Sequence, residues 1–107
     1  MREPDECRSM VEVRAGVDGL DAEIVTLLGR RMRFMEAAAR IKTSRDQIRD
    51  EARKAAVIAH AQAVADNVGF PPRLAAELYE LLVEASIAYE HQCFDTRGMA
   101  FQSPTDP

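Results

Sequence analysis

Four basic side chains stand out in this sequence because helical periodicity places them among apolar residues. They are Arg14, Arg31, Lys42 and Arg53. At 100° per residue, Arg31 lies in the middle of the apolar stripe of its segment, and Lys42 lies within about 20° of Arg31. A cation on a face that should be buried needs an anionic partner. Several guanidinium groups and an ammonium group with few internal anions describe a pocket for a small dianion, most simply a dicarboxylate.

The spacing of these cations limits which of them can share one pocket. Arg31 and Lys42 are about 16 Å apart along a helix axis, so two long side chains leaning inward could bracket a small ligand. Arg14 is about 25 Å from Arg31 on the same rod, which is too far for one pocket in one chain. Arg14 would have to come from a partner helix that runs the other way.

Each candidate also has an ordinary structural explanation. Surface ion pairs with neighbouring charges would account for three arginines: Arg14, Arg31 and Arg53. Lys42 could cap the C-terminus of a helix, where cations are favoured. Ser86, in an apolar helix, could bond back to a backbone carbonyl, and Glu90 could face solvent. Only the combination of these residues points to a binding site.

Covalent and metal-dependent catalysis have no signature in this sequence. There is no Ser-His-Asp arrangement, activated cysteine or phosphate loop. Cys7 and Cys93 are far apart, and His60 and His91 lack local partners, so we expect neither a metal site nor a cofactor. A reaction catalysed here would be driven by shape and fixed charge.

The overall composition favours a single all-α domain. The 107 residues are 47% hydrophobic and 30% charged, and they lack tryptophan. The net charge of −4 argues against a nucleic-acid binder that works through a basic surface. No apolar run approaches the length of a membrane span, and the charged N-terminus lacks the apolar core of a signal peptide, so we expect a cytoplasmic protein.

The longest predicted element is an amphipathic helix over residues 10–42 that no proline interrupts. Such a helix is about 50 Å long. A compact monomer of this size has a diameter of only roughly 35 Å. The far apolar face of the helix therefore needs a second chain to cover it, and we expect a homodimer with interlocked long helices.

Two further helices are predicted, over residues 49–67 and 72–94, separated by Asn67-Val68-Gly69 and Pro71-Pro72. The polar cluster after Lys42 is a weaker break signal. The third helix is apolar on most of its circumference, so it belongs in the middle of the assembly. Residues 1–9 and 98–107 are expected to be flexible tails on either side of the helical domain, residues 10–97.

The spacing of the polar residues forms a larger pattern. An arginine lies early in the first helix, a second arginine follows 17 residues later, and a lysine follows 11 further on. An aspartate and an arginine open the second helix, and a polar pair lies near the end of the third. This pattern, over roughly residues 10–97, resembles the AroQ-type chorismate mutases. Their salicylate-forming branch, the isochorismate pyruvate lyases, is similar in these stretches: Asp5-Glu6-Cys7, Leu28-Gly29-Arg30-Arg31-Met32, Ala37-Ala38 and Thr96-Arg97-Gly98.

The resemblance implies an intertwined homodimer with two identical active sites, shared between the chains, that bind a small dicarboxylate and need no cofactor. Arg14 from the partner chain and Arg31 would grip the two substrate carboxylates. Lys42 would donate to the ether oxygen of the breaking C–O bond. The remaining candidates would line the pocket or contact the substrate: Asp50, Arg53, Ser86 and Glu90, the last as a second donor to the ether oxygen.

The sequence departs from the family pattern at two positions. Many members have glutamine where this chain has Glu90, and a carboxylate cannot donate a hydrogen bond unless it holds a proton. Lys54 stands where many mutases have a glutamate that holds the ring hydroxyl of the substrate.

Chorismate mutase activity is our first expectation, with isochorismate pyruvate lyase activity as the alternative and an amino-deoxychorismate mutase as a further one. A non-catalytic helical dimer that binds an anionic metabolite is the alternative of another class.

Overall fold

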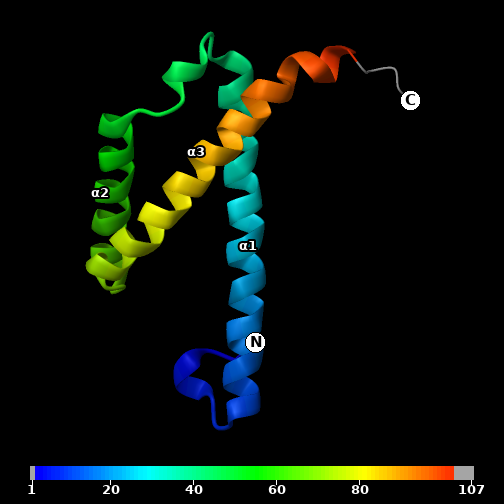
Figure 1. The fold of residues 1–107 in the computed structure, drawn as a ribbon. Helices are drawn as coiled ribbons and strands as arrows, with labels where there is room; N and C mark the ends of the chain where they lie inside the picture. The colour runs from blue at the N-terminus through cyan, green and yellow to red at the C-terminus, as the bar shows by residue number, and fades with distance from the viewer. Residues whose placement is uncertain (1, 103–107) are drawn as a thin grey trace. The chain divides into compact units, whose positions relative to one another are not determined.

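The structure is a computed structural model that describes the backbone of residues 2–102 and the side chains of residues 2–97. All regular structure within the described backbone is helical (Figure 1): η1 (Pro4–Glu6), α1 (Met10–Ile41), η2 (Arg45–Gln47), α2 (Glu51–Val68) and α3 (Pro72–Gln102). The predicted all-α class with three main helices is confirmed. The chain divides into an N-terminal unit, Met1–Arg33, and a C-terminal unit, Phe34–Pro107, with the boundary inside α1.

The helix boundaries follow the sequence closely except at the end of the third helix. α1 and α2 match their predicted ranges to within two residues. The predicted end of the third helix near Phe94 is wrong, because α3 continues to Gln102. Gly98 lowers helix stability by only about 1 kcal/mol, which does not by itself end a helix. Residues 103–107 of the predicted C-terminal tail lie outside the described residues, and the flexibility of both tails stays a prediction.

The start of α1 in the N-terminal unit is held by side-chain caps. Ser9 Oγ accepts a hydrogen bond from the backbone N–H of Glu12 at 3.3 Å. The Glu12 carboxylate reaches back to the backbone N–H of Arg8 at 2.6 Å and forms an ion pair with Arg2 at 2.8 Å. These contacts use the exposed N–H groups at the helix start and tie the preceding segment to α1.

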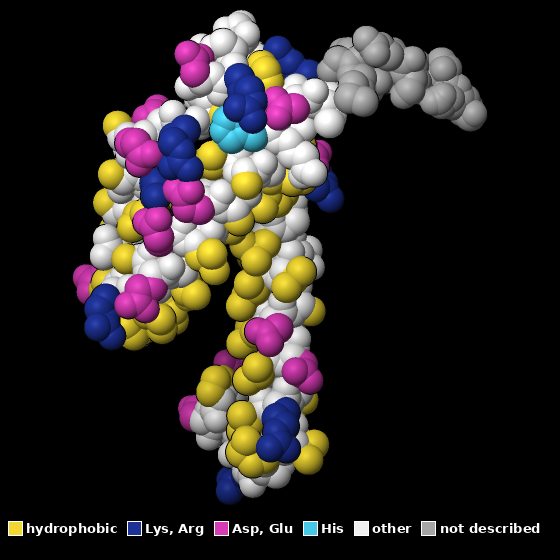
Figure 2. Space-filling view, viewed as in Figure 1, with side chains coloured by type: hydrophobic (Ala, Val, Ile, Leu, Met, Phe, Trp, Pro, Cys, Tyr) yellow, Lys and Arg dark blue, Asp and Glu magenta, His cyan; other side chains and the backbone are white. Residues whose placement is uncertain are grey.

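The N-terminal unit leaves an apolar stripe of α1 exposed, and Figure 2 shows hydrophobic side chains at the surface of this helix. Ile24 is 52% exposed. The other members of the stripe are Val13, Val17, Leu20 and Leu27. Despite these exposed residues, none of the helices within the described residues is both long enough and apolar enough to cross a membrane.

In the C-terminal unit, α2 and α3 form an antiparallel hairpin (Figure 1). Gly69, with φ of 78°, ends α2 in the left-handed conformation that glycine adopts without strain. The N–H of Phe70 donates to the carbonyl of Ala65 at 2.8 Å, and Pro72 then starts α3. The break predicted from Asn67-Val68-Gly69 and Pro71-Pro72 is confirmed.

The connection between α1 and α2 is built from polar side chains. Gln47 Oε1 accepts hydrogen bonds from the backbone N–H groups of Thr43 at 2.8 Å and Ser44 at 3.2 Å, which closes the turn η2. Asp50 then caps α2 by accepting a hydrogen bond from the N–H of Arg53 at 3.0 Å. This loop places Lys42 at the junction between α1 and the hairpin.

The buried apolar core of the described chain is small and consists mostly of alanine: Ala39, Ile48, Ala65, Ala75 and Val83. Small side chains let α2 and α3 approach each other closely, but each buries little apolar area. Most of the large apolar side chains remain partly or largely exposed, Leu81 to 71%. A single copy of the chain therefore gains little hydrophobic stabilisation for its length.

Candidate functional site

The candidate residues that the structure brings together lie in the C-terminal unit, where α3 passes the end of α1. Lys42 is the first residue after α1, and its N–H continues the helix by donating to the carbonyl of Ala38 at 2.9 Å. Its ammonium Nζ lies 2.7 Å from Glu90 Oε2 on α3. The side chain of Lys42 is 28% exposed and that of Glu90 only 6%. A partly solvent-accessible ammonium group thus lies against a buried carboxylate.

Glu90 is buried, so the alternative that it faces solvent is wrong. Among the described residues, its Oε2 atom has no hydrogen bond of good geometry, and its close contact is the ion pair with Lys42. A short N–O contact with an ammonium group is typical of an ionised carboxylate. In this structure Glu90 therefore neutralises and orients Lys42.

Ser86 lies four residues before Glu90, on the same side of α3, and is buried. Its Oγ donates to the carbonyl of Leu82 at 2.7 Å, as the ordinary structural explanation expects. A hydroxyl oxygen that donates can still accept a hydrogen bond, so this contact is compatible with a polar lining near Glu90.

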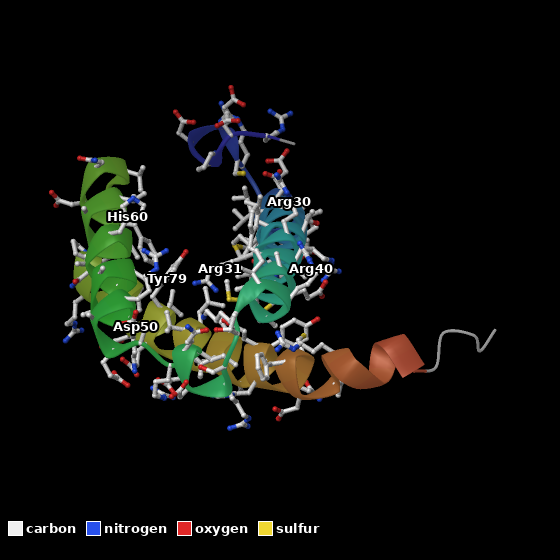
Figure 3. All side chains as sticks on the ribbon, turned by 90° about the horizontal axis from the view of Figure 1, so that it is seen from above. Arg30, Arg31, Arg40, Asp50, His60 and Tyr79 are labelled. Atoms are coloured by element: carbon white, nitrogen blue, oxygen red, sulfur yellow. The ribbon has the colours of Figure 1, made fainter. Side chains whose placement is uncertain are left out.

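Asp50 and Arg53 lie at the start of α2, and Figure 3 shows Asp50 there. The Asp50 carboxylate is engaged in the N-cap, and the Arg53 side chain is exposed. The effect of Asp50 in this structure is therefore on the backbone, because its side chain fixes the first turn of α2.

Lys54, on α2, forms ion pairs with two glutamates of α3. Its Nζ donates to Glu80 Oε2 and to Glu84 Oε2, both at 2.7 Å, and its side chain is 16% exposed. Arg49 adds a second cation to Glu84 at 2.6 Å. Hydrogen bonds from Arg49 first, and from Lys54 next, lower the pKa of Glu84 to about 2. In Figure 2, acidic and basic side chains are mixed over this part of the C-terminal unit.

Arg14 and Arg31 both lie on α1 within the N-terminal unit. Arg14 is exposed and Arg31 is partly buried. The structure thus groups Lys42, Ser86 and Glu90 in one unit and carries the two proposed carboxylate-binding arginines in the other.

Sequence reasoning missed the role of Arg97 at this end of α1. Its Nη1 donates to the carbonyl of Ala39 at 2.9 Å and to that of Lys42 at 2.7 Å. The available signal was its position two helical turns after Glu90, which places both side chains on one face of α3.

The arrangement around Lys42 can stabilise negative charge on a bound ligand. An ammonium group has three N–H donors, so Lys42 can keep its ion pair with Glu90 and still donate to a ligand. Because Lys42 is partly exposed and fixed at its base, its other donors can reach a ligand oxygen without a large rearrangement. Within the described residues, no cluster of histidine, cysteine, aspartate and glutamate could hold a metal ion.

Comparison with known proteins gives two matches. The family model described as chorismate mutase type II matches residues 13–91. A protein named isochorismate pyruvate lyase, from Pseudomonas aeruginosa, is 33% identical over 104 residues, which cover 94% of this chain and 100% of that protein. All seven candidate site residues fall inside the family match, and Arg97 falls outside it.

Proposed function

Because this chain belongs to the type II chorismate mutase family, we propose that Lys42 promotes a pericyclic reaction of a chorismate-type dicarboxylate. The observation that supports the proposal is the partly exposed ammonium of Lys42, held 2.7 Å from the buried carboxylate of Glu90. A fixed cation of this kind can donate to the ether oxygen as the C–O bond breaks and the oxygen gains electron density. No covalent intermediate with the protein is needed.

The two ends of the substrate need different partners. We assign the grip on its two carboxylates to Arg31 and to Arg14 of the partner subunit, because guanidinium groups bind carboxylates with two parallel hydrogen bonds. Arg53, Ser86 and the first turn of α2 at Asp50 would line the remaining wall. Binding at both ends holds the enolpyruvyl side chain folded over the ring, which removes much of the entropic barrier.

The shared site requires a homodimer, and the burial pattern supports one. The N-terminal unit exposes an apolar stripe along α1, and the described chain has a core of five mostly small residues. A monomer would leave this stripe in water at a cost of about 25 cal/mol for each Å². We therefore propose that a second copy covers α1, with its own long helix antiparallel to the first.

Between the two reactions of this fold, we favour the isochorismate pyruvate lyase reaction. In that reaction one C–O bond breaks and a ring hydrogen moves to the leaving enolpyruvyl methylene, so that isochorismate yields salicylate and pyruvate. The relative named for this activity aligns over nearly the whole chain. Lys54, bound to Glu80 and Glu84, also replaces the glutamate that holds the ring hydroxyl in many mutases. This reverses the order of preference derived from the sequence.

Rearrangement of chorismate to prephenate remains the second candidate, supported by the family match itself. Here the same C–O bond breaks and a C–C bond forms within one molecule. Both reactions place developing negative charge on the ether oxygen, so Lys42 would serve either one.

One purified sample separates these functions. Salicylate fluorescence from isochorismate supports the lyase, whereas loss of chorismate absorbance with formation of prephenate supports the mutase. The amino-deoxychorismate analogue is the third substrate to supply. No turnover of any of the three would contradict the enzymatic proposal and favour a binding protein for anionic metabolites.

The role of Lys42 is tested in the same assay. Lys42→Ala should abolish turnover while the circular dichroism spectrum and the oligomeric state stay unchanged. The matched control is Arg45→Ala, which removes an exposed cation three residues further on that contacts Asp95. Full turnover by Lys42→Ala would refute the assigned role.

A further inference from the structure

The C-terminal end of α1 is held by Arg97, a side chain that the mechanism above does not use. The last carbonyl groups of a helix lack intrahelical donors and need other partners. Arg97 Nη1 supplies one donor to the carbonyl of Ala39 at 2.9 Å and to that of Lys42 at 2.7 Å. A cation at this end also complements the negative end of the helix dipole.

The Arg97 guanidinium is itself fixed in place. Its central carbon lies 3.8 Å from the centroid of the Phe94 ring, one turn earlier on α3. The side chain is partly buried. Stacking on the ring and two carbonyl contacts leave the guanidinium little rotational freedom, so it can define the position of the chain to which it donates.

Glu90 and Arg97 together hold Lys42 at both of its ends. They are seven residues apart on α3, about two turns, so both point toward the end of α1. Glu90 contacts the ammonium group of Lys42, and Arg97 contacts its backbone carbonyl. The neighbouring ion pair of Arg45 and Asp95 is exposed and joins η2 to α3.

We propose that Arg97 is a positioning residue that fixes the backbone of Lys42, and thereby its ammonium group, for the reaction; this rests on the proposed function of Lys42. Loss of the guanidinium would leave the carbonyls of Ala39 and Lys42 without their donor and would let the last turn of α1 fray. A displacement of about 1 Å at a catalytic group can cost about 100-fold in rate.

The test is the steady-state kinetics of Arg97→Ala with whichever substrate the wild-type protein turns over. We expect kcat to fall about 10- to 100-fold, with KM changed less than about threefold, since the lost contact serves the transition state more than substrate binding. Arg97→Lys keeps the positive charge and an ammonium group that can donate to a carbonyl. Its kcat should therefore lie between that of the wild type and that of Arg97→Ala. Arg45→Ala is the matched control and should keep the wild-type kcat.

A second measurement does not depend on activity. The N–H of Lys42 donates to the carbonyl of Ala38 in the last turn of α1, the turn that should fray without Arg97. Arg97→Ala should therefore speed hydrogen exchange at the Lys42 amide at least tenfold, while amides in the middle of α2 keep their protection. If Arg97→Ala does not fold, the same two measurements on Arg97→Lys decide the matter.

The outcomes separate the two proposals. A Lys42→Ala variant with full turnover refutes the proposed function. The hydrogen-exchange result then still tests whether Arg97 fixes the backbone of Lys42. A dead Lys42→Ala variant together with wild-type kcat in Arg97→Ala refutes the positioning role. Unchanged Lys42 amide exchange in Arg97→Ala refutes it as well, whatever the kinetics show.

Discussion

Replacing Glu90 by glutamine should make this protein a faster catalyst. In the structure the Glu90 carboxylate neutralises the Lys42 ammonium at 2.7 Å. That carboxylate stabilises the resting lysine but opposes the negative charge that develops on the ether oxygen. The amide of Glu90→Gln would keep an oxygen for Lys42 to donate to, remove the opposing charge, and add an N–H donor of its own.

The size of the effect follows from the geometry. If Lys42 Nζ bridges Glu90 and the ether oxygen with two normal hydrogen bonds, the two oxygens lie roughly 4.5 Å apart. Half a unit of negative charge at that distance from a carboxylate is opposed by about 2 kcal/mol with an effective dielectric constant of about 20. Some of this is offset by looser orientation of Lys42, so we expect kcat/KM of Glu90→Gln to rise about tenfold at pH 8.

The assay is the steady-state kcat/KM of the wild type and of Glu90→Gln at pH 8. Because the carboxylate opposes the charge that develops on the ether oxygen and the amide does not, Glu90→Gln should exceed the wild type about tenfold. Glu77→Gln, on an exposed face of α3, is the matched control and should reproduce the wild-type value. A Glu90→Gln variant that is no faster than the wild type would refute this reasoning.

Three further predictions concern the fold and the assembly. The pKa of Glu84 is lowered to about 2 from 4.5, so the stability it contributes is complete above about pH 4.5 and is lost as the pH falls toward 2. Thermal melts of Glu84→Gln between pH 6 and pH 2 should therefore lack this part of the acid destabilisation, and an unchanged pH profile would contradict the role of the Arg49 and Lys54 contacts. Gly69→Ala should cost about 1 kcal/mol in urea unfolding and Gly69→Asn less, because φ is positive there; equal stability of all three proteins would argue against the left-handed cap. Ile24→Asp should convert the proposed dimer to monomers or unfolded chain in sedimentation, because it places a charge on the exposed apolar stripe of α1, whereas Glu23→Gln should not; a dimer that survives Ile24→Asp would exclude this stripe as the interface.

The three helices and the break between the last two could be predicted from the sequence because their causes are local. Apolar spacing of three and four residues sets the helical face. Gly69 is favoured where φ is positive, and Pro72 starts a helix because its missing N–H is not needed in the first turn. The end of α3 was misjudged because the pattern weakens after Phe94, yet nothing near Gly98 is strong enough to stop a helix that has already formed.

The family could also be identified from the sequence, since the spacing of its polar residues is a linear pattern that the family match bears out. That pattern identified Lys42 and Glu90 as candidates, but it carried no information about their contact. Glu90 could equally have faced solvent on periodicity alone.

Only the tertiary structure decided the surroundings of Lys42. Glu90 and Arg97 are 48 and 55 residues away from it in the chain, and no helical period relates positions on two different helices. Their contacts exist because the α1–α2 turn and the Gly69 turn bring α3 back past the end of α1. The candidate side chains can therefore be read from the order of residues, whereas the ion pair with Glu90 and the hydrogen bond from Arg97 depend on how the helices pack.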